Sequence, residues 1–542
     1  MSVNVTGGTD EGVLDALVKD QVASKLAAGD PTLWGRDAEH EASIRLGWVD
    51  LARTSRPLLA EIDALRAELR DEGIDHIVLS GMGGSSLAPE VITATAGVPL
   101  TVLDSTDPGY VRRALGDRLE RTAVVVSSKS GTTVETDSHR RVYVEAFTAA
   151  GIDASRRIVV VTDPGSPLVE LAESEGYRKV FLANPHVGGR YSALTAFGLV
   201  PAGLAGADVS ALLDDAEEVM AALAADSPDN PALLLGAALG AAHNAGREKV
   251  VLGAGDTDIV GFAAWTEQLI AESTGKLGKG LLPVDVGSAT DGSPGWGGFR
   301  GRRSGDSPRQ GNRATRVSIG GSDADPDLVT EGPLGAQMLL WETAVAVAGR
   351  VIGINPFDQP NVEEAKKQAR SLLDNPSAGD GLPLAFTEGA VEVYADPGSL
   401  PGDRTLAAVL ASLRDLVPEH GYLALQAYLD RVADGDAAEL RGAVATRTEL
   451  QTTFGWGPRF LHSTGQYHKG GHQNGGFVQV TGVVTDDLAI PGRPYTFGTL
   501  IAAQAAGDAV VLRGTGRPVV RLHLTDRAAG LRQLLAAATA TT

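Results

Sequence analysis

The sequence predicts an α/β fold with two doubly wound, flavodoxin-like domains built on parallel sheets, followed by a C-terminal α/β extension. Short β-branched runs alternate with amphipathic stretches of helical period, a pattern typical of βαβ units whose sheet is covered on both faces. A second set of such runs begins near residue 249. The length of 542 residues exceeds what one hydrophobic core usually supports, so we expect more than one domain.

The amino-terminal part predicts helices and then a first set of strands. Between residues 11 and 70, apolar positions such as Leu14, Leu17 and Val18 recur at the three-to-four spacing of a helix. Five short runs that follow predict parallel strands: 74–79, 99–103, 122–126, 157–161 and 179–181.

The alternation of predicted helices and strands then starts again in the second half of the chain. Residues 207–247 predict helices, and later runs predict three strands: 249–252, 316–319 and 350–352. Beyond residue 401 we expect helices at 404–415 and 419–434 and a glycine-rich stretch at 455–477. The chain ends in strand and helix patterns: 475–484, 495–506, 508–512 and 518–524. Four segments are predicted: an N-terminal helical segment at 1–70, a first domain at 71–206, a second domain at 207–400 and a C-terminal region at 401–542.

Composition narrows the possible partners. Lys and Arg number 47 against 68 Asp and Glu, which gives a net charge of −21. Such a surface repels phosphate backbones and anionic lipid, so we expect no nucleic-acid or membrane partner. The absence of cysteine excludes disulfides, zinc thiolates, iron–sulfur clusters and thiol nucleophiles. The first residues lack the pattern of a secretory signal and no apolar run reaches about 20 residues, so a cytoplasmic location is expected.

One basic segment stands out in this acidic chain. Residues 285–316 are rich in Gly, Ser and Arg and predict a long loop. Six arginines lie between 300 and 316, where Asp306 is the one acidic residue. Contact with RNA through an RGG-like segment is the functional alternative. The net charge and the scarcity of aromatic neighbours favour a solvated loop.

A glycine-rich turn follows the first predicted strand. The segment VLSGMGGSSLAPEVI places Gly81, Gly83 and Gly84 between that strand and an amphipathic stretch. Glycines let the backbone approach a ligand closely, and a helix N-terminus offers free N–H groups. The hydroxyls of Ser85 and Ser86 add donors, while a plain strand-to-helix turn is the structural alternative. The dinucleotide-binding fingerprint fails because it requires glycine where Ser86 stands, and no Walker A pattern occurs.

A second turn is richer still in donors. TAVVVSSKSGTTVET runs from a strand into residues 127–133, where six of seven residues can donate to an anion. Open α/β sheets bind ligands at the carboxyl ends of their strands. Two such turns in one domain favour a phosphate or sulfate monoester over a plain Ser/Thr loop.

These two turns resemble the phosphate-binding loops of the sugar-isomerase (SIS) family. Three further segments resemble glucose-6-phosphate isomerases: VGGRYSALTAFGLVP (187–201), AESTGK (271–276) and INPFDQPNVEEAKKQ (354–368). The five segments follow one another in the order of that family between residues 80 and 368. By this resemblance the chain is identified as a member of the glucose-6-phosphate isomerase family with two SIS-type domains.

The resemblance implies a reversible isomerisation of D-glucose 6-phosphate to D-fructose 6-phosphate through a cis-enediol, with neither cofactor nor metal. It also implies a homodimer with its active site at the subunit interface. It assigns the phosphate of the substrate to these residues: Gly84, Ser85, Ser128, Lys129, Ser130 and Thr133.

The same resemblance distributes the chemical roles. Glu272 becomes the base that moves a proton between C1 and C2, and Arg190 stabilises the enediolate. Gln268, one helical turn before Glu272, contacts the sugar. Lys366 contacts the substrate and assists ring opening, with Lys367 as the alternative that spacing leaves open. Without the resemblance these residues have plain alternatives: a helix-end glutamate, a structural ion pair, a surface glutamine and a solvated lysine.

Ring opening also needs a histidine, and here the chain departs from the family. Residues 277–353 contain no histidine. The later segment LHSTGQ resembles the family's histidine segment, which makes His462 the first candidate and His468 the second, from either subunit. A metal site of His462, His468 and His472 is disfavoured because no acidic residue falls within 455–480. Loop histidines bonded to the backbone are the plain alternative.

Two other functions stay open. One is an isomerase of another sugar phosphate, such as an amino sugar or mannose 6-phosphate, because the phosphate turns do not read the ring hydroxyls. The other is a non-catalytic SIS module that senses a phosphosugar. The set of Glu272, Arg190 and Lys366 argues against a sensor, which needs no base. In each case the partner is a small-molecule sugar phosphate.

Overall fold

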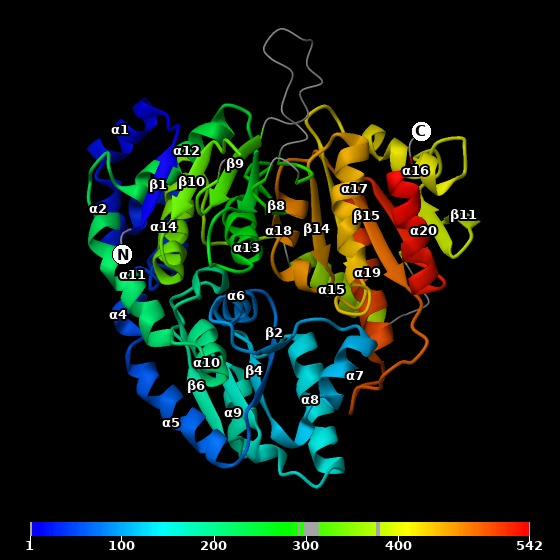
Figure 1. The fold of residues 1–542 in the computed structure, drawn as a ribbon, viewed down its shortest axis with the longest axis horizontal. Helices are drawn as coiled ribbons and strands as arrows, with labels where there is room; N and C mark the ends of the chain where they lie inside the picture. The colour runs from blue at the N-terminus through cyan, green and yellow to red at the C-terminus, as the bar shows by residue number, and fades with distance from the viewer. Residues whose placement is uncertain are drawn as a thin grey trace.

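The computed structural model describes residues 3–290, 293–296, 314–322, 324–361, 363–374 and 380–540, without the side chains of residues 363, 365, 366 and 374. Within these ranges the strands form three sheets, and each sheet is the centre of one lobe (Figure 1). Two lobes lie side by side at the top of that view, and the remaining lobe, called the lower lobe below, lies beneath them. The α/β class and the parallel-dominated sheets predicted from the sequence are confirmed.

The lower lobe is built on a parallel sheet in the order β3-β2-β4-β5-β6. Its strands are β2 (His76–Gly81), β3 (Thr101–Leu103), β4 (Thr122–Ser127), β5 (Ile158–Thr162) and β6 (Lys179–Leu182). Its helices are α6 (Leu87–Thr95), α7 (Pro108–Gly116), α8 (Val134–Ala149), α9 (Pro167–Ser174) and α10 (Ala196–Ala205). The chain leaves β2 for β3 on one side and returns to β4 on the other. The loops after β2 and β4 therefore meet at the switch point of the sheet, where such folds bind ligands.

The second lobe is the upper lobe that contains the first strand of the chain. Its sheet has the order β1-β10-β9-β7-β8. Its strands are β1 (Asn4–Gly7), β7 (Lys249–Ala254), β8 (Leu282–Ser288), β9 (Ala314–Ile319) and β10 (Leu328–Glu331). Its helices are α11 (Val209–Leu223), α12 (Pro231–Asn244), α13 (Phe262–Thr274) and α14 (Leu334–Ile352). A Cβ at Gly240 of α12 would lie 2.5 Å from the Cβ of Val351 in α14, so this glycine permits the close packing of the two helices. Neighbouring strands of this sheet run parallel to one another, except that β1 pairs with β10 in the antiparallel direction.

Five helices precede the first sheet, as the sequence predicts: α1 (Glu11–Lys19), α2 (Val22–Ala27), α3 (Arg36–Ser43), α4 (Leu51–Thr54) and α5 (Pro57–Asp71). The strand expected at 350–352 is wrong, because these residues form the last turn of α14. Helix α14 is buried over almost its whole length, and an apolar run of this kind carries little period to separate helix from strand.

The third lobe is the other upper lobe, next to the second lobe, and its sheet has the order β11-β12-β16-β15-β13-β14. Its strands are β11 (Leu384–Glu388), β12 (Val391–Ala395), β13 (Tyr422–Tyr428), β14 (Thr452–Trp456), β15 (Gly475–Gly482) and β16 (Val519–Leu524). Its helices are α16 (Leu406–Ser412), α17 (Glu439–Thr448), α18 (Gly465–Gly470), α19 (Phe497–Gly514) and α20 (Arg527–Thr539). Strands β14, β13, β15 and β16 run parallel, while β12 and β11 extend the sheet antiparallel. The predicted patterns at 495–506 and 508–512 are one helix, α19.

The helix expected at 419–434 is also wrong, because β13 occupies its centre. All seven residues of β13 are buried, since the strand lies inside the sheet between β14 and β15. Such strands are apolar on both faces and lose the alternation that distinguishes strand from helix.

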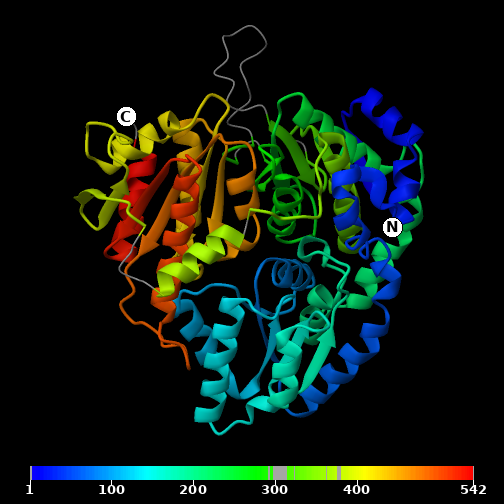
Figure 2. The same cartoon turned by 180° about the vertical axis from the view of Figure 1, so that it is seen from behind.

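Buried ion pairs join the lower lobe to the third lobe. Arg459 lies between Glu90 of α6 and Asp104 at the end of β3, with a 3.0 Å contact to Asp104. Arg431 pairs with the same two carboxylates, at 2.8 Å from Glu90 and 3.7 Å from Asp104. Helix α15 (Glu363–Asp374) crosses between the lobes and packs along α19 (Figure 2). The lower and third lobes are thereby held in one arrangement around the space between them.

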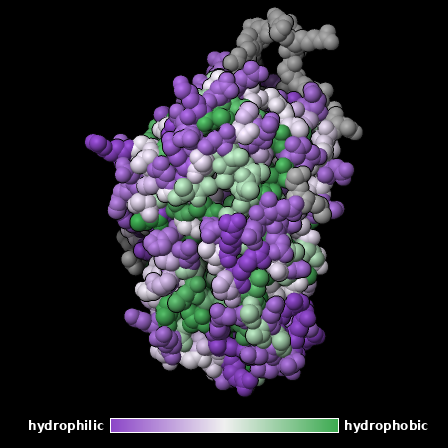
Figure 3. Space-filling view, turned by 90° about the vertical axis from the view of Figure 1, so that its left-hand side faces the viewer, coloured by the Kyte–Doolittle hydropathy of each residue, from purple (hydrophilic) through white to green (hydrophobic). Residues whose placement is uncertain are grey.

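One face of the molecular surface can be described by its hydropathy. The face on the side of α1, α2 and α5 is mostly hydrophilic, and its hydrophobic residues lie in separate patches (Figure 3). Among the described residues, no helix is both long and apolar enough to cross a membrane. The long loop predicted at 285–316 is wrong at both ends, because residues 285–288 belong to β8 and 314–316 to β9. Residues 291–292 and 297–313 of this segment, with five of its arginines between 300 and 313, fall outside the described residues. The four domain ranges given above stay predictions.

Candidate active site

A cavity of about 560 Å³ lies where the three lobes meet. The lower lobe contributes the loops after β2 and β4, and the second lobe contributes α13. The third lobe contributes α19 and the short helical turn η9 (Arg459–His462). These predicted site residues line the cavity together: Gly84, Ser85, Ser128, Lys129, Ser130, Thr133, Gln268, Glu272 and His462.

The turn after β2 is held by backbone on two sides. Gly83 has a φ of +56°, and a Cβ there would lie 2.3 Å from the carbonyl oxygen of His462. A Cβ at Gly84 would lie 2.1 Å from the carbonyl oxygen of Gly189. The two glycines therefore permit approaches that any other residue would block. The turn brings Ser85 to the cavity and places the N-terminus of α6 beside it.

The loop after β4 presents hydroxyls that bond to one another. The Ser128 Oγ lies 2.9 Å from the Thr133 Oγ1, and the Ser130 Oγ lies 3.0 Å from the Thr132 Oγ1. Thr133 is the N-cap residue of α8, but its side chain makes no capping bond. The first N–H groups of α8 thus point towards an anion site without a side-chain acceptor. An incoming phosphate would replace the hydroxyl pairs with charge-assisted hydrogen bonds.

The charges beside this loop are largely balanced. The Lys129 ammonium pairs with Asp163, whose pKa is raised by burial against the opposing effect of Lys129. Arg45 and Arg370 also line the cavity. Sequence reasoning did not select these two arginines, since neither lies in a motif.

Glu272 and Arg190 form a buried pair at one wall. The Arg190 Nε lies 3.2 Å from the Glu272 Oε2, and the exposed fractions of the two side chains are 3% and 6%. The Arg190 Nη1 donates to the carbonyl oxygens of Glu272 and Pro356, at 2.6 and 2.9 Å. Its Nη2 donates to the Asp358 carbonyl and to the Gln359 Oε1, at 3.1 and 3.2 Å. Arg190 is absent from the described residues that line the cavity, so stabilising an enediolate would require one N–H group to change partner.

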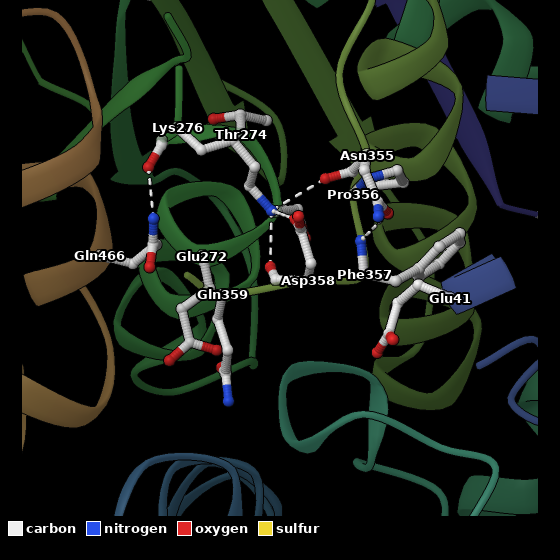
Figure 4. A network of polar contacts seen from close by, with 12 residues as sticks. Glu41, Glu272, Thr274, Lys276, Asn355, Pro356, Phe357, Asp358, Gln359 and Gln466 are labelled. Carbon is white, nitrogen blue, oxygen red and sulfur yellow. Dashed lines mark hydrogen bonds and ion pairs between the residues drawn. The ribbon is translucent and has the colours of Figure 1, made fainter. Parts of the chain in front are cut away.

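A second cation, Lys276, supports the same wall. Its Nζ donates to the carbonyl oxygens of Asn355 and Asp358 and contacts the Asp358 Oδ1 at 2.7 Å (Figure 4). Burial, together with the charge of Arg190, lowers the pKa of Lys276 to about 7. In Figure 4 the side chains of Glu272 and Gln359 lie next to each other and point in the same direction. Lys276 ends the AESTGK segment, yet its burial could not be foreseen from the sequence.

His462 enters the cavity from the third lobe. Its Nε2 lies 3.1 Å from the Glu135 Oε1, and that oxygen also accepts from the Gln504 Nε2 at 2.7 Å. The Gln268 Nε2 donates to the His462 carbonyl at 3.0 Å, while the buried Gln268 Oε1 has no hydrogen-bond partner among the described residues. A carboxylate that fixes one imidazole nitrogen sets the tautomer and the ring orientation. Glu135 is thus a site residue to which the sequence alone assigned no role, although it lies within the segment TAVVVSSKSGTTVET, two residues after Thr133.

Two further candidates lie elsewhere. The ring of His468 packs among Tyr422, Phe460 and Phe477 in the third lobe and does not line the cavity. Burial lowers the pKa of His468 well below its usual value. Lys366 belongs to α15, which reaches the cavity one turn later, but its side chain lies outside the described residues.

No group of three or more His, Asp or Glu side chains within the described residues is arranged to hold a metal ion. His472 contacts Glu248 at 2.8 Å, far along the loop from His462 and away from the cavity lining.

Known proteins resemble this chain in sequence. The family model for phosphoglucose isomerase matches residues 67–294. The probable glucose-6-phosphate isomerase of Natronomonas pharaonis is 30% identical over 373 residues, which cover 61% of this chain and 87% of that protein. The glucose-6-phosphate isomerase of Acaryochloris marina is 31% identical, with 60% of this chain and 77% of that protein covered. The chain belongs to the phosphoglucose isomerase family.

Other members of the phosphoglucose isomerase family match a smaller share. The probable glucose-6-phosphate isomerase of Haloarcula marismortui is 38% identical over 221 residues, and the chain spans 50% of that protein. Among solved structures, a hypothetical protein from Thermus thermophilus has a TM-score of 0.58 at 25% identity, with 69% of this chain and 100% of that chain covered. A glucose-6-phosphate isomerase from Chlamydia trachomatis has a TM-score of 0.54 at 19% identity, with coverage of 69% and 89%, and supports the shared fold.

Proposed function

We propose that this protein interconverts D-glucose 6-phosphate and D-fructose 6-phosphate by proton transfer between side chains and substrate. The observation that carries the proposal is that one cavity is lined by a buried carboxylate, Glu272, a carboxylate-bound histidine, His462, and two anion-binding turns. Family membership supports the same reaction. A phosphate held in the turns would direct the sugar towards Glu272 and His462.

The phosphate end is bound first in this scheme. The hydroxyls of Ser85, Ser128, Ser130 and Thr133 and the N–H groups at the start of α8 supply donors, while Lys129 keeps a positive charge nearby. Hydrogen bonds to a charged group are worth about 1.5–3 kcal/mol each. Binding at this end is the same before and after isomerisation, so it contributes affinity more than rate.

Ring opening follows. The C1 hydroxyl loses its proton as the ring oxygen gains one, and the C1–O5 bond breaks to leave an aldehyde. His462, oriented by Glu135, is the side chain that exchanges the proton at the ring oxygen. The assistance assigned to Lys366 belongs to this step.

Isomerisation moves one proton between carbons. The Glu272 carboxylate removes the proton from C2, the electron pair forms the C1–C2 double bond, and the carbonyl oxygen at C1 becomes the enediolate oxygen. The protonated Glu272 then returns its proton to C1, and the proton of the C2 hydroxyl passes to the enediolate oxygen at C1, so that C2 becomes the carbonyl and C1 carries the hydroxyl. Arg190 pairs with Glu272 from behind, and movement of one guanidinium N–H would extend its charge to the enediolate.

The test is the variant Glu272→Gln, assayed with glucose 6-phosphate and, in the reverse direction, with fructose 6-phosphate. General-base catalysis contributes about 10²–10⁴ in rate, so kcat is expected to fall by that factor while sugar-phosphate binding is nearly unchanged. The matched control is Glu267→Gln on the same helix. Burial raises the pKa of Glu267 well above its usual value, and this side chain does not line the cavity. Full turnover by Glu272→Gln would remove this residue as the base.

The site is proposed to form within one chain. What supports this is that His462 and Glu272 line the same cavity of a single chain, next to the buried pairs of Arg459. Mixing Glu272→Gln with His462→Asn subunits by co-expression tests it. Sites within one chain stay defective in the mixture, whereas sites shared across an interface regain activity in a fraction of the subunits. The homodimer stays a prediction in either case.

A further inference from the structure

One face of the third sheet carries polar side chains where a buried sheet is usually apolar. Strand register places Gln426 beside Gln479, which is paired with Arg521. In the next row Tyr428 pairs with Thr481, which pairs with His523. Residues two apart on a strand share a face, so both rows lie on the same side of the sheet. Helix α19 packs against these strands.

A cavity of about 300 Å³ opens between this face and α19. It lies at the carboxyl ends of β13, β15 and β16, where Tyr428, Thr481 and His523 line it. On the side of α19 the lining is apolar, with Ile501 and Ala505 and the exposed Ala502 between them at the rim; Leu382 and Val484 add apolar lining from outside this helix. The chain passes from β13 to β14 on one side and to β15 on the other, so the cavity lies near the switch point of this sheet. It is separate from the active-site cavity, since among the described residues none lines both.

Polar groups at this place lack partners within the described part of the chain. Tyr428 is 2% exposed, and its hydroxyl makes no hydrogen bond there. One row deeper, neither polar atom of the Gln426 side-chain amide has a hydrogen-bond partner among the described residues. Burial raises the pKa of Tyr428, and the nearby Asp508 carboxylate adds to the rise, so the hydroxyl stays protonated and able to donate. Buried polar groups of native proteins are paired with protein, water or ligand.

The charges around the cavity cancel. Arg521 forms an ion pair with Asp380 and donates to the Gln479 Oε1 at 2.8 Å. Deeper in the lobe, Lys469 and Asp508 form a pair at 2.5 Å. Burial lowers the pKa of His523, whose Nδ1 lies 2.9 Å from the Thr481 Oγ1. A site with mixed donors and acceptors, a neutral charge balance and one apolar wall fits an uncharged ligand that presents several hydroxyls on one side and C–H groups on the other.

We propose that this cavity is a second binding site, for an uncharged polyhydroxylated small molecule such as a monosaccharide or a cyclic polyol. The Tyr428 hydroxyl and the Arg521–Asp380 pair contact ligand hydroxyls, and Ile501 and Ala505 pack against its C–H face. The volume lies at the lower end of the range for small-molecule sites, about 300–1,000 Å³, which suits a ligand of one ring. Arg521, the arginine that lines this cavity, is already paired with Asp380, so we expect an uncharged ligand to be preferred here over a phosphate ester. The proposal is independent of the reaction assigned to the other cavity.

The test measures binding to the full chain by isothermal titration and ligand-observed NMR, with D-glucose, myo-inositol and glucose 6-phosphate as probes. We expect saturable binding of at least one uncharged probe that glucose 6-phosphate does not displace. Tyr428→Phe removes one hydroxyl, which has no hydrogen-bond partner among the described residues. This variant is expected to weaken ligand binding about tenfold, the equivalent of one hydrogen bond. Ala502→Trp fills the rim and is expected to abolish binding. Both variants should isomerise sugar phosphates at the rate of the unmodified protein.

Tyr422→Phe is the matched control. This residue lies on the same strand and face, and its buried hydroxyl also lacks a hydrogen-bond partner in the described structure, but it does not line the cavity. The proposal is wrong if neither uncharged probe gives a saturable signal, or if glucose 6-phosphate displaces that signal. It is also wrong if binding survives Ala502→Trp or responds equally to Tyr422→Phe and Tyr428→Phe. Should Tyr428→Phe fail to fold, Ala502→Trp alone decides, because its side chain begins at the rim.

Discussion

The two halves of the proposed active site are built differently. At the proton-transfer half, Glu272 and His462 are each held by a charged neighbour, Arg190 and Glu135, and both pairs are largely buried. At the phosphate half, the hydroxyls of the loop after β4 bond mainly to one another, and Ser130 is exposed. Groups that move protons need fixed geometry, whereas groups that bind an anion must exchange partners when it arrives. The comparison predicts that substitutions in the first half lower kcat and those in the second raise KM.

The largest effect is expected from the histidine pair. His462→Asn removes the acid–base group and should lower kcat with cyclic glucose 6-phosphate by about 10²–10⁴. Glu135→Gln keeps the hydrogen bond to the imidazole but removes the charge, so a smaller loss and a shifted pH profile are expected. Steady-state kinetics across pH distinguish the two. Unchanged kcat in His462→Asn would exclude this residue from the chemistry.

The next effect concerns stability. Arg459→Met removes one of two arginines that pair with Glu90 and Asp104, three residues before His462. Breaking a buried ion pair by removing one partner typically costs about 3–5 kcal/mol, here reduced because Arg431 remains. Thermal unfolding should shift to lower temperature. Arg53→Met, at an exposed pair with Glu217, is the control and should shift little.

At the phosphate half the effect should be smaller and should appear in KM. Ser128→Ala and Thr133→Val each remove one donor to the phosphate, worth about 1.5–3 kcal/mol, so KM should rise about tenfold or more with kcat nearly unchanged. The unphosphorylated sugar provides the comparison. A fall in kcat at constant KM would contradict the division between the halves.

A further effect, which is small over any single pH unit, is a pH dependence of stability. The pKa of Lys276 is about 7 in the folded protein against 10.5 for the free side chain, so the unfolded chain binds more protons between these values. Stability therefore rises with pH through this window, by at most about 1.4 kcal/mol per unit. Lys276→Met should lack that part of the slope. Urea midpoints of both proteins at several pH values between neutral and alkaline measure the difference, and parallel slopes would contradict the assignment.

Much of the fold could be predicted from the sequence. The alternation of β-branched runs and helical periods predicted the strands of the lower lobe, and β2, β4 and β5 are buried as parallel strands should be. The same burial hid β13, whose residues 422–428 read as part of a helix. β1 was missed because it makes its pairing with β10, more than 320 residues away, and short edge strands carry little local signal.

The site residues also fall into those that the sequence could predict and those that it could not. Glycines, hydroxyls and motif residues mark their own positions in the chain, so the two turns, Glu272 and Gln268 could be selected from the sequence. Glu135, Gln504 and Arg45 owe their place to tertiary contacts. The ordinary glutamate two residues after Thr133 becomes notable only when a loop from residue 462 arrives beside it.

The buried pairs between the lobes have a consequence for behaviour in concentrated electrolyte. Mobile ions screen charges at the surface within about 10 Å at 0.1 M, but they do not reach pairs such as Arg459 with Asp104. Dissolved salt should therefore leave the lobes together while it weakens the long-range repulsion between a dianionic sugar phosphate and a protein of net charge −21. Capture of the substrate from solution should accelerate as ionic strength rises, the reverse of what a basic phosphate-binding protein shows.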